Sequence, residues 1–97
     1  MAKKGYCVVF YKSASDPTVQ AEYAKVARPA IEAAGGRFLA AAKPAKTFES
    51  GGSDRVVLIE FDSVEKAIAA YESDAYKVAL KVFNNAAVRD IRIVESL

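Results

Sequence analysis

The chain has 97 residues, 53% of them apolar and 27% charged, which is the size and composition of one globular domain spanning residues 1–97. Its 14 basic and 12 acidic residues are mixed along the sequence and give a net charge of +2, so neither nucleic acid nor a membrane surface is an expected partner. No apolar run approaches the roughly 20 residues of a membrane span, and the single cysteine, Cys7, cannot form an internal disulfide. The sequence therefore predicts a cytoplasmic protein.

The first predicted strand covers residues 5–12, where aromatic and β-branched side chains make both faces apolar. A helix should follow from Asp16, because an aspartate at the N-cap accepts hydrogen bonds from the first turn and Pro17 suits the first helical position. The apolar residues of this helix recur at spacings of three and four. Pro29 should kink or restart it, and the glycine pair at 35–36 should end it.

The next segment reads as a long β-hairpin, with strands at 37–42 and 55–61 and a mobile, glycine-rich tip between them. The second of these strands is again apolar on both faces. If the hairpin is symmetric about its tip, Arg37 on one strand lies near Glu60 on the other, although a long loop leaves room for a shift of two residues.

A second helix should begin after Ser63, which is a predicted cap, and Asp62 and Glu65 have the spacing of a capping box. This helix should break and restart around residues 72–74, where a fresh capping sequence occurs, and should end near residues 84–85.

A short apolar segment at 91–94 should form the last strand. The predicted order is therefore β-α-β-β-α-β, an α+β ferredoxin-like fold with a four-stranded antiparallel sheet and two helices on one face. Two helices cover only one sheet face, yet three of the strands are apolar on both faces, which leaves an apolar area of about 400 Å² uncovered. A second copy of the chain is the commonest cover for such a face, so we expect a homodimer, the alternative being a monomer with a sufficiently polar open face.

Three segments resemble a known family: RPAIEAAGGRFLA, VVLIEFDSVEKAIAAYESDAY and DIRIVES. They resemble the small bacterial family known as domain of unknown function 1330, which belongs to the dimeric α/β-barrel group, in which two ferredoxin-like sheets face each other. The resemblance runs from Gly5 to Glu95, with the segments in order and at matching spacings. It implies a dimeric α/β barrel from a bacterium, and no particular substrate, because the family's function is unestablished.

The chain departs from the family's pattern at several positions. A second aromatic residue common near Gln20 is missing, and the aromatic residue common before the Tyr71 position is Ala70. The arginine expected seven residues after Tyr76 is Phe83. If that arginine holds an anionic ligand in relatives, this chain has either lost the contact or moved it to another residue.

The chain contains no histidine, which excludes histidine-based catalytic triads, His–Cys pairs and histidine-containing zinc sites. One cysteine and scattered carboxylates give no metal-ligand spacing, and no glycine pattern of a nucleotide-binding loop occurs. We therefore expect neither a metal nor a cofactor.

Arg37 and Glu60 form the clearest polar pair, because both lie on otherwise apolar strands. A carboxylate desolvated by apolar neighbours has a raised pKa and can act as a base, whereas a paired arginine lowers that pKa and can hold an anionic substrate. A structural ion pair or a dimer contact is the alternative. Tyr23 is a further catalytic candidate. The ligand-binding candidates, chosen for their guanidinium, hydroxyl or amide groups, are Arg37, Tyr6, Tyr71 and Asn84.

Three classes of function remain open. The leading hypothesis is a homodimer of unknown activity with a cleft for a small organic ligand. The enzyme alternative, by resemblance to other dimeric α/β barrels, is a cofactor-independent monooxygenase or isomerase in which Glu60 or a tyrosine moves a proton and Arg37 stabilises the developing anion. The third is a non-catalytic regulatory or scaffold dimer. A pocket that holds Arg37, Glu60 and a tyrosine hydroxyl together would favour the enzyme.

Overall fold

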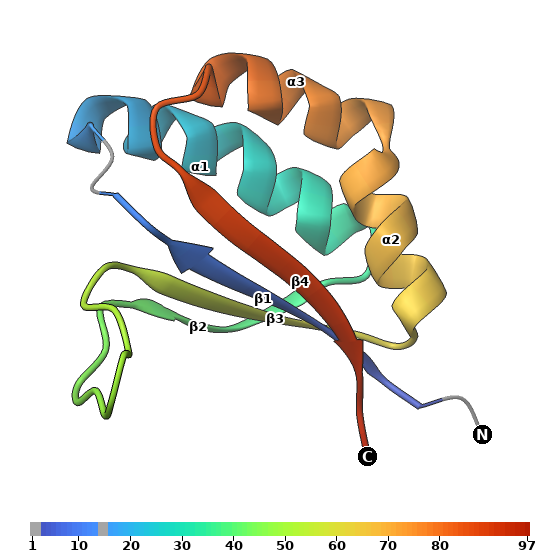
Figure 1. Ribbon diagram of the computed structural model, residues 1–97. Coiled ribbons are helices and arrows are strands. Elements are labelled where there is room, and N and C mark those ends of the chain that lie inside the picture. The colour runs from blue at the N-terminus through green and yellow to red at the C-terminus, as the bar shows by residue number, and fades with distance from the viewer. Residues whose placement is uncertain (1–2, 14–15) are drawn as a thin grey trace.

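The computed structural model describes residues 3–13 and 16–97, which form a four-stranded sheet covered on one face by three helices (Figure 1). In these ranges no helix is long and apolar enough to cross a membrane. The predicted α+β ferredoxin-like order is confirmed, with the second helical segment in two parts. The elements are β1 (Gly5–Tyr11), α1 (Pro17–Ala33), β2 (Arg37–Ala42), β3 (Val56–Phe61), α2 (Val64–Glu72), α3 (Asp74–Phe83) and β4 (Arg89–Glu95).

The strands lie in the order β2-β3-β1-β4, and every neighbouring pair is antiparallel. The hairpin register places Arg37 opposite Glu60, as the sequence predicts, and the β2–β3 pairing shifts by one residue between Phe38 and Ala40. At the far end of β1, Tyr11 lies opposite Arg89 of β4, and the Tyr11 amide donates a hydrogen bond of 2.9 Å to the carbonyl of Arg55. The backbone at the end of β1 therefore pairs with the backbone of both Arg55 and Arg89.

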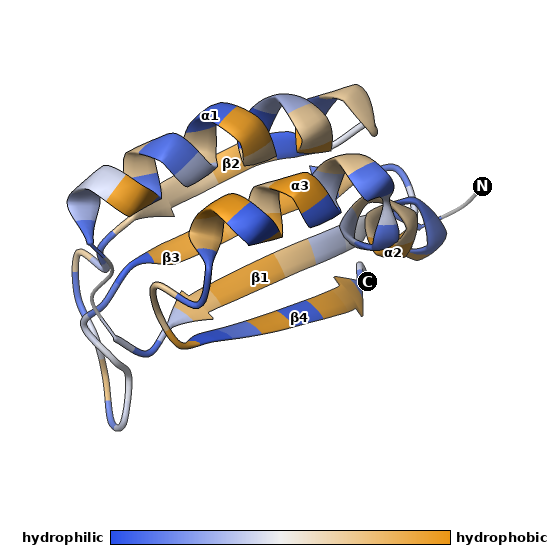
Figure 2. Cartoon of the chain, turned by 90° about the horizontal axis from the view of Figure 1, so that it is seen from above, coloured by the Kyte–Doolittle hydropathy of each residue, from blue (hydrophilic) through white to orange (hydrophobic). Residues whose placement is uncertain are grey.

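The core lies between the sheet and the helices. Because side chains alternate along a strand, β1 and β3 each bury every second residue against the helices. The α1 helix contributes Tyr23, Ala27 and Ile31, which recur every four residues and so lie on one face. Figure 2 shows that β1 and β3 are hydrophobic along most of their length, not only at the buried positions. The other sheet face is therefore apolar at its centre, where Val8 lies opposite Leu58, and no helix of the described chain covers it.

The first helix begins as predicted, because the Asp16 carboxylate accepts hydrogen bonds from the amides of Thr18 and Val19 at 2.8 and 3.2 Å. The expected restart at Pro29 is wrong, since α1 continues through this residue to Ala33. Proline removes one helical hydrogen bond, and the packing of the buried α1 residues on either side keeps the helix continuous.

The glycine pair ends α1 for two different reasons. Gly35 has a φ of +97°, a conformation that other residues rarely adopt. At Gly36, an added Cβ atom would lie 2.5 Å from Cγ2 of Ile31 and 2.9 Å from the ring of Phe61. The chain therefore turns from α1 into β2 where the backbone packs directly on the core.

The predicted capping box at Asp62 and Glu65 is wrong. The N-cap of α2 is Ser63, whose hydroxyl accepts from the amide of Lys66 at 3.2 Å. The Asp62 carboxylate accepts instead from Nη2 of Arg37 at 3.0 Å, so an ion pair across the hairpin replaces the local cap. The predicted break between the two helical parts is confirmed at Ser73, the last residue before α3.

Candidate functional site

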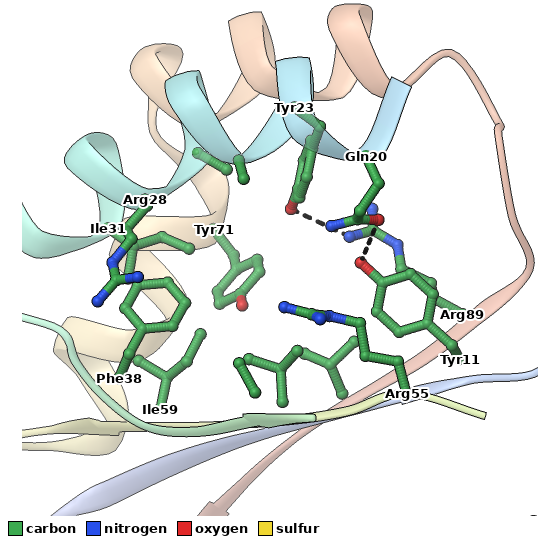
Figure 3. A pocket seen from close by; sticks show the side chains of 15 residues that line it. Tyr11, Gln20, Tyr23, Arg28, Ile31, Phe38, Arg55, Ile59, Tyr71 and Arg89 are labelled. Carbon is green, nitrogen blue, oxygen red and sulfur yellow. Dashed lines mark hydrogen bonds between the residues drawn. The ribbon is translucent and has the colours of Figure 1, made fainter. Parts of the chain in front are cut away.

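A partly enclosed cavity of about 90 Å³ lies between α1 and the sheet (Figure 3). Its apolar walls include Ala27 of α1, Val9 of β1 and Val57 and Ile59 of β3. The cavity exists because α1 packs mainly against α3 and only lightly against β2. Small side chains on facing elements, such as Ala24 and Ala41, do not fill the space that remains.

Arg55 directs its side chain into this cavity (Figure 3). It directly precedes β3, and the two-residue alternation of a strand places it on the same face as Val57 and Ile59. Its Nε atom is buried and has no hydrogen-bond partner among residues 3–13 and 16–97. A buried donor without a partner costs about 1–3 kcal/mol, and more when it is charged, so this guanidinium is a group that favours an added acceptor.

Arg89 carries the second guanidinium of the cavity. This guanidinium already has hydrogen-bond and stacking partners within the protein. Its Nη1 donates to the hydroxyl of Tyr23 at 3.0 Å, and the hydroxyls of Tyr23 and Tyr76 lie 2.7 Å apart. The guanidinium carbon lies 3.9 Å from the ring centroid of Phe83, a close cation–π contact. Burial acts to lower the pKa of Arg89, but the tyrosine hydroxyls outweigh it and raise the pKa, so Arg89 stays charged. A guanidinium from β4 therefore stacks against Phe83, at the position where the resemblance to the family leads us to expect an arginine.

The remaining polar groups of the cavity are tyrosines and an amide. The Tyr11 hydroxyl donates to Oε1 of Gln20 at 3.1 Å. Burial raises the pKa of the Tyr71 hydroxyl, which lies beside the Cys7 thiol, so Tyr71 stays protonated and is a hydrogen-bond donor. Among the described residues that line the cavity, three are arginines and none is acidic.

A second polar cluster lies on the open face of the sheet and contains three residues nominated from the sequence. Glu60 accepts hydrogen bonds from Nε of Arg37 at 2.9 Å and from the hydroxyl of Tyr6 at 3.1 Å. Lys4 lies 3.7 Å from the same carboxylate. The hydrogen bond from Arg37, helped by the one from Tyr6, lowers the pKa of Glu60 below its ordinary value. This environment stabilises the carboxylate as an ion-pair partner and weakens it as a base.

The structure divides the nominated residues between the two sheet faces. Tyr6, Arg37 and Glu60 meet on the open face, whereas Tyr23 and Tyr71 line the cavity on the helix side. Asn84 belongs to neither group, because it is exposed and ends α3 in the left-handed conformation, with a φ of 45°. The pocket expected for an enzyme, with Arg37, Glu60 and a tyrosine hydroxyl around one cavity, does not form within the described part of this single chain.

Sequence reasoning missed the two arginines that define the cavity. The sequence predicts Arg55 only as the first residue of the second hairpin strand, and Arg89 lies outside the expected last strand at 91–94. The signal that identifies them is the strand alternation, since Arg55 continues the face of Val57 and Arg89 that of Ile91.

Solved structures with similar folds include the RPA0582 protein of unknown function from Rhodopseudomonas palustris, with 18% sequence identity, a TM-score of 0.72, and coverage of 100% of this chain and 85% of that one. SnoaB, described as a cofactor-independent oxygenase from Streptomyces nogalater, has 9% identity, a TM-score of 0.68 and coverage of 99% and 95%. A dimeric ferredoxin-like protein of unknown function from Thermobifida fusca has 11% identity, a TM-score of 0.56 and coverage of 99% and 93%. At these identities the likeness establishes the fold alone.

A comparison with curated proteins gives no match. The sequence does match a family pattern over residues 4–97, which is nearly the whole chain. The chain therefore belongs to the family described as a domain of unknown function (DUF1330).

Proposed function

We propose that this protein is a homodimer that binds a small organic molecule in the cavity between α1 and the sheet. The observation that carries the proposal is the composition of the cavity wall, which combines apolar side chains with a few converging polar groups. Small-molecule sites in proteins have this composition, because the apolar wall supplies affinity and the polar groups fix orientation.

The size of the cavity restricts the ligand. A volume of about 90 Å³ is well below the roughly 300–1,000 Å³ of sites for drug-sized molecules and closer to the roughly 150 Å³ of an engineered cavity that admits benzene. The ligand is therefore compact. Tyr11, Gln20 and Arg55 also line an adjoining surface depression with Lys43 and Asp54, which gives a small molecule a path from solvent.

The dimer would form through the open sheet face. This face is apolar at its centre, where Val8 and Leu58 lie opposite each other, and Phe10 and Val94 there are 39% and 48% exposed. An identical sheet across a two-fold axis covers such a face at low cost. The Thermobifida fusca protein with the same fold is described as dimeric, which agrees with this arrangement.

The cavity is tested by blocking it with matched variants. Ala24 and Ala21 are both exposed alanines of α1, but only Ala24 lines the cavity. We expect native mass spectrometry and thermal-shift measurements with a panel of small acids, amides and alcohols to find a compact ligand. That ligand should bind the native protein and Ala21→Phe and should not bind Ala24→Phe. Equal binding to both variants, or no binding by any compound, would refute the proposal.

A cofactor-independent enzyme is the second candidate, because Tyr6, Glu60 and Arg37 meet on one sheet face, even though the bond from Arg37 lowers the pKa of Glu60 and makes it a weak base. SnoaB, which shares the fold, is described as a cofactor-independent oxygenase. In this alternative Glu60 or a tyrosine removes a proton and Arg37 stabilises the anion, and the substrate lies between the two sheets of a dimer. Glu60→Gln should then abolish turnover and leave substrate binding intact. Unchanged turnover in that variant would exclude Glu60 as the base.

A further inference from the structure

The Arg55 guanidinium is the polar group of the cavity with the greatest need of a partner. Its Nε atom is buried and unpaired, and its side chain makes no hydrogen bond or ion pair within residues 3–13 and 16–97. A guanidinium cannot lose its proton at physiological pH, so burial cannot be relieved by neutralisation. An anion that enters the cavity supplies the missing acceptor.

The other charged groups around the cavity do not compete for this role. Arg28 lies over the ring of Phe38 at 5.2 Å and pairs with Glu32 at 3.9 Å on the outside of α1. Arg89 is held by its bond to a tyrosine hydroxyl and by ring stacking. Asp54, which shares the adjoining depression with Arg55, forms no ion pair with it among the described residues.

The shape of the site limits the anion to a short-chain acid. The planar fork of a guanidinium matches the two oxygens of a carboxylate. Beside it, Val57 and Ile59 of β3 and Ala27 of α1 offer an apolar wall for only a few carbon atoms. The Tyr71 hydroxyl lines the same space.

We propose that the ligand of this cavity is a small monocarboxylate, bound through its oxygens by the Arg55 guanidinium with its short carbon chain against Val57 and Ile59. This inference rests on the proposed function and names the class of ligand for the same cavity. The carboxylate pairs the buried Nε, so binding satisfies a donor that has no hydrogen-bond partner among residues 3–13 and 16–97.

The test compares acids with neutral molecules of the same shape. Affinities for propionate and isobutyrate are measured by calorimetry at fixed pH and ionic strength, against propionamide, isobutyramide, chloride and inorganic phosphate. The native protein should bind isobutyrate about tenfold or more tightly than isobutyramide. Arg55→Gln should remove this preference, and Arg55→Lys should keep part of it. Lys25→Gln, which removes a positive charge from an exposed α1 residue that does not line the cavity, should keep all of it.

The outcomes separate this inference from the proposed function. If acid and amide bind equally well and Ala24→Phe blocks both, the cavity binds small molecules but the carboxylate assignment is wrong. If phosphate binds more tightly than every carboxylate, and depends on Arg55, the site takes inorganic oxyanions and the assignment is again wrong. If none of the compounds binds, both proposals fail. Circular dichroism of Arg55→Gln and Arg55→Lys confirms that the variants fold.

Discussion

The Tyr23 hydroxyl provides a quantitative test of the site, because it joins Arg89 to Tyr76 in the interior. It accepts from the guanidinium of Arg89 at 3.0 Å and lies 2.7 Å from the Tyr76 hydroxyl. Tyr23 and Tyr76 are 7% and 2% exposed, so water does not replace a lost partner easily.

Tyr23→Phe and Tyr76→Phe should lower the free energy of unfolding by different amounts. Tyr23→Phe removes a hydrogen bond to a charged group, worth about 1.5–3 kcal/mol, and a neutral bond worth about 0.5–1.5 kcal/mol, which gives a destabilisation of about 2–4.5 kcal/mol. Tyr76→Phe removes the bond between the two hydroxyls and leaves Tyr23 bonded to Arg89, at a cost of about 1 kcal/mol. In a domain of this size each kcal/mol lowers the Tm by about 4–8 °C.

The assay is urea unfolding followed by far-UV circular dichroism. It is run at one protein concentration, because the proposed dimer would make stability depend on concentration. The chain has no tryptophan, so fluorescence is less useful. Ligand binding should survive Tyr23→Phe, since its hydroxyl is engaged by protein groups. If Tyr76→Phe destabilises the protein as much as Tyr23→Phe does, the hydrogen bond from Arg89 to Tyr23 adds no stability, and this reasoning is refuted.

Three further predictions concern the dimer, the core and pH. Leu58→Glu on the open sheet face should shift the protein to a monomer in light scattering at micromolar concentration, whereas Val78→Glu on the exposed side of α3 should not; equal behaviour would argue against this interface. Gly36→Ala should destabilise the protein by about 1–3 kcal/mol in urea unfolding, because its methyl group overlaps Ile31, and an unchanged midpoint would show that the core yields there. The pKa of Glu60 is lowered in the folded protein, so its contribution to stability is present above the ordinary carboxyl pKa and is lost as the pH falls through the lowered value. The stability difference between native protein and Glu60→Gln should therefore be seen at pH 7 and vanish in acid; a difference that persists at pH 2 would contradict the ion pair.

Much of the fold follows from local pattern. The alternation and apolar runs of β1 and β3, the Asp16 cap and the break at Ser73 are all encoded within a few residues of where they act. The contact between Arg37 and Glu60 was also predictable, because a single hairpin, continuous in sequence, joins the two strands that carry them.

Long-range interactions decided the features that sequence reasoning missed. Asp62 has the spacing of a cap, but Arg37 of β2 engages its carboxylate and leaves Ser63 to cap α2. The two cavity arginines come together because Arg55 and Arg89 both pair with the backbone around Tyr11, from opposite sides of β1. No short stretch of sequence contains that arrangement.

The most direct test of the central claim is a crystal structure of the protein grown with isobutyrate. The account predicts density for one small molecule between Ala27 and Ile59, with a carboxylate oxygen at a hydrogen-bonding distance of about 2.7–3.2 Å from Nε of Arg55. A dry cavity, or one filled by the Arg55 side chain paired with a carboxylate of the protein itself, would contradict it.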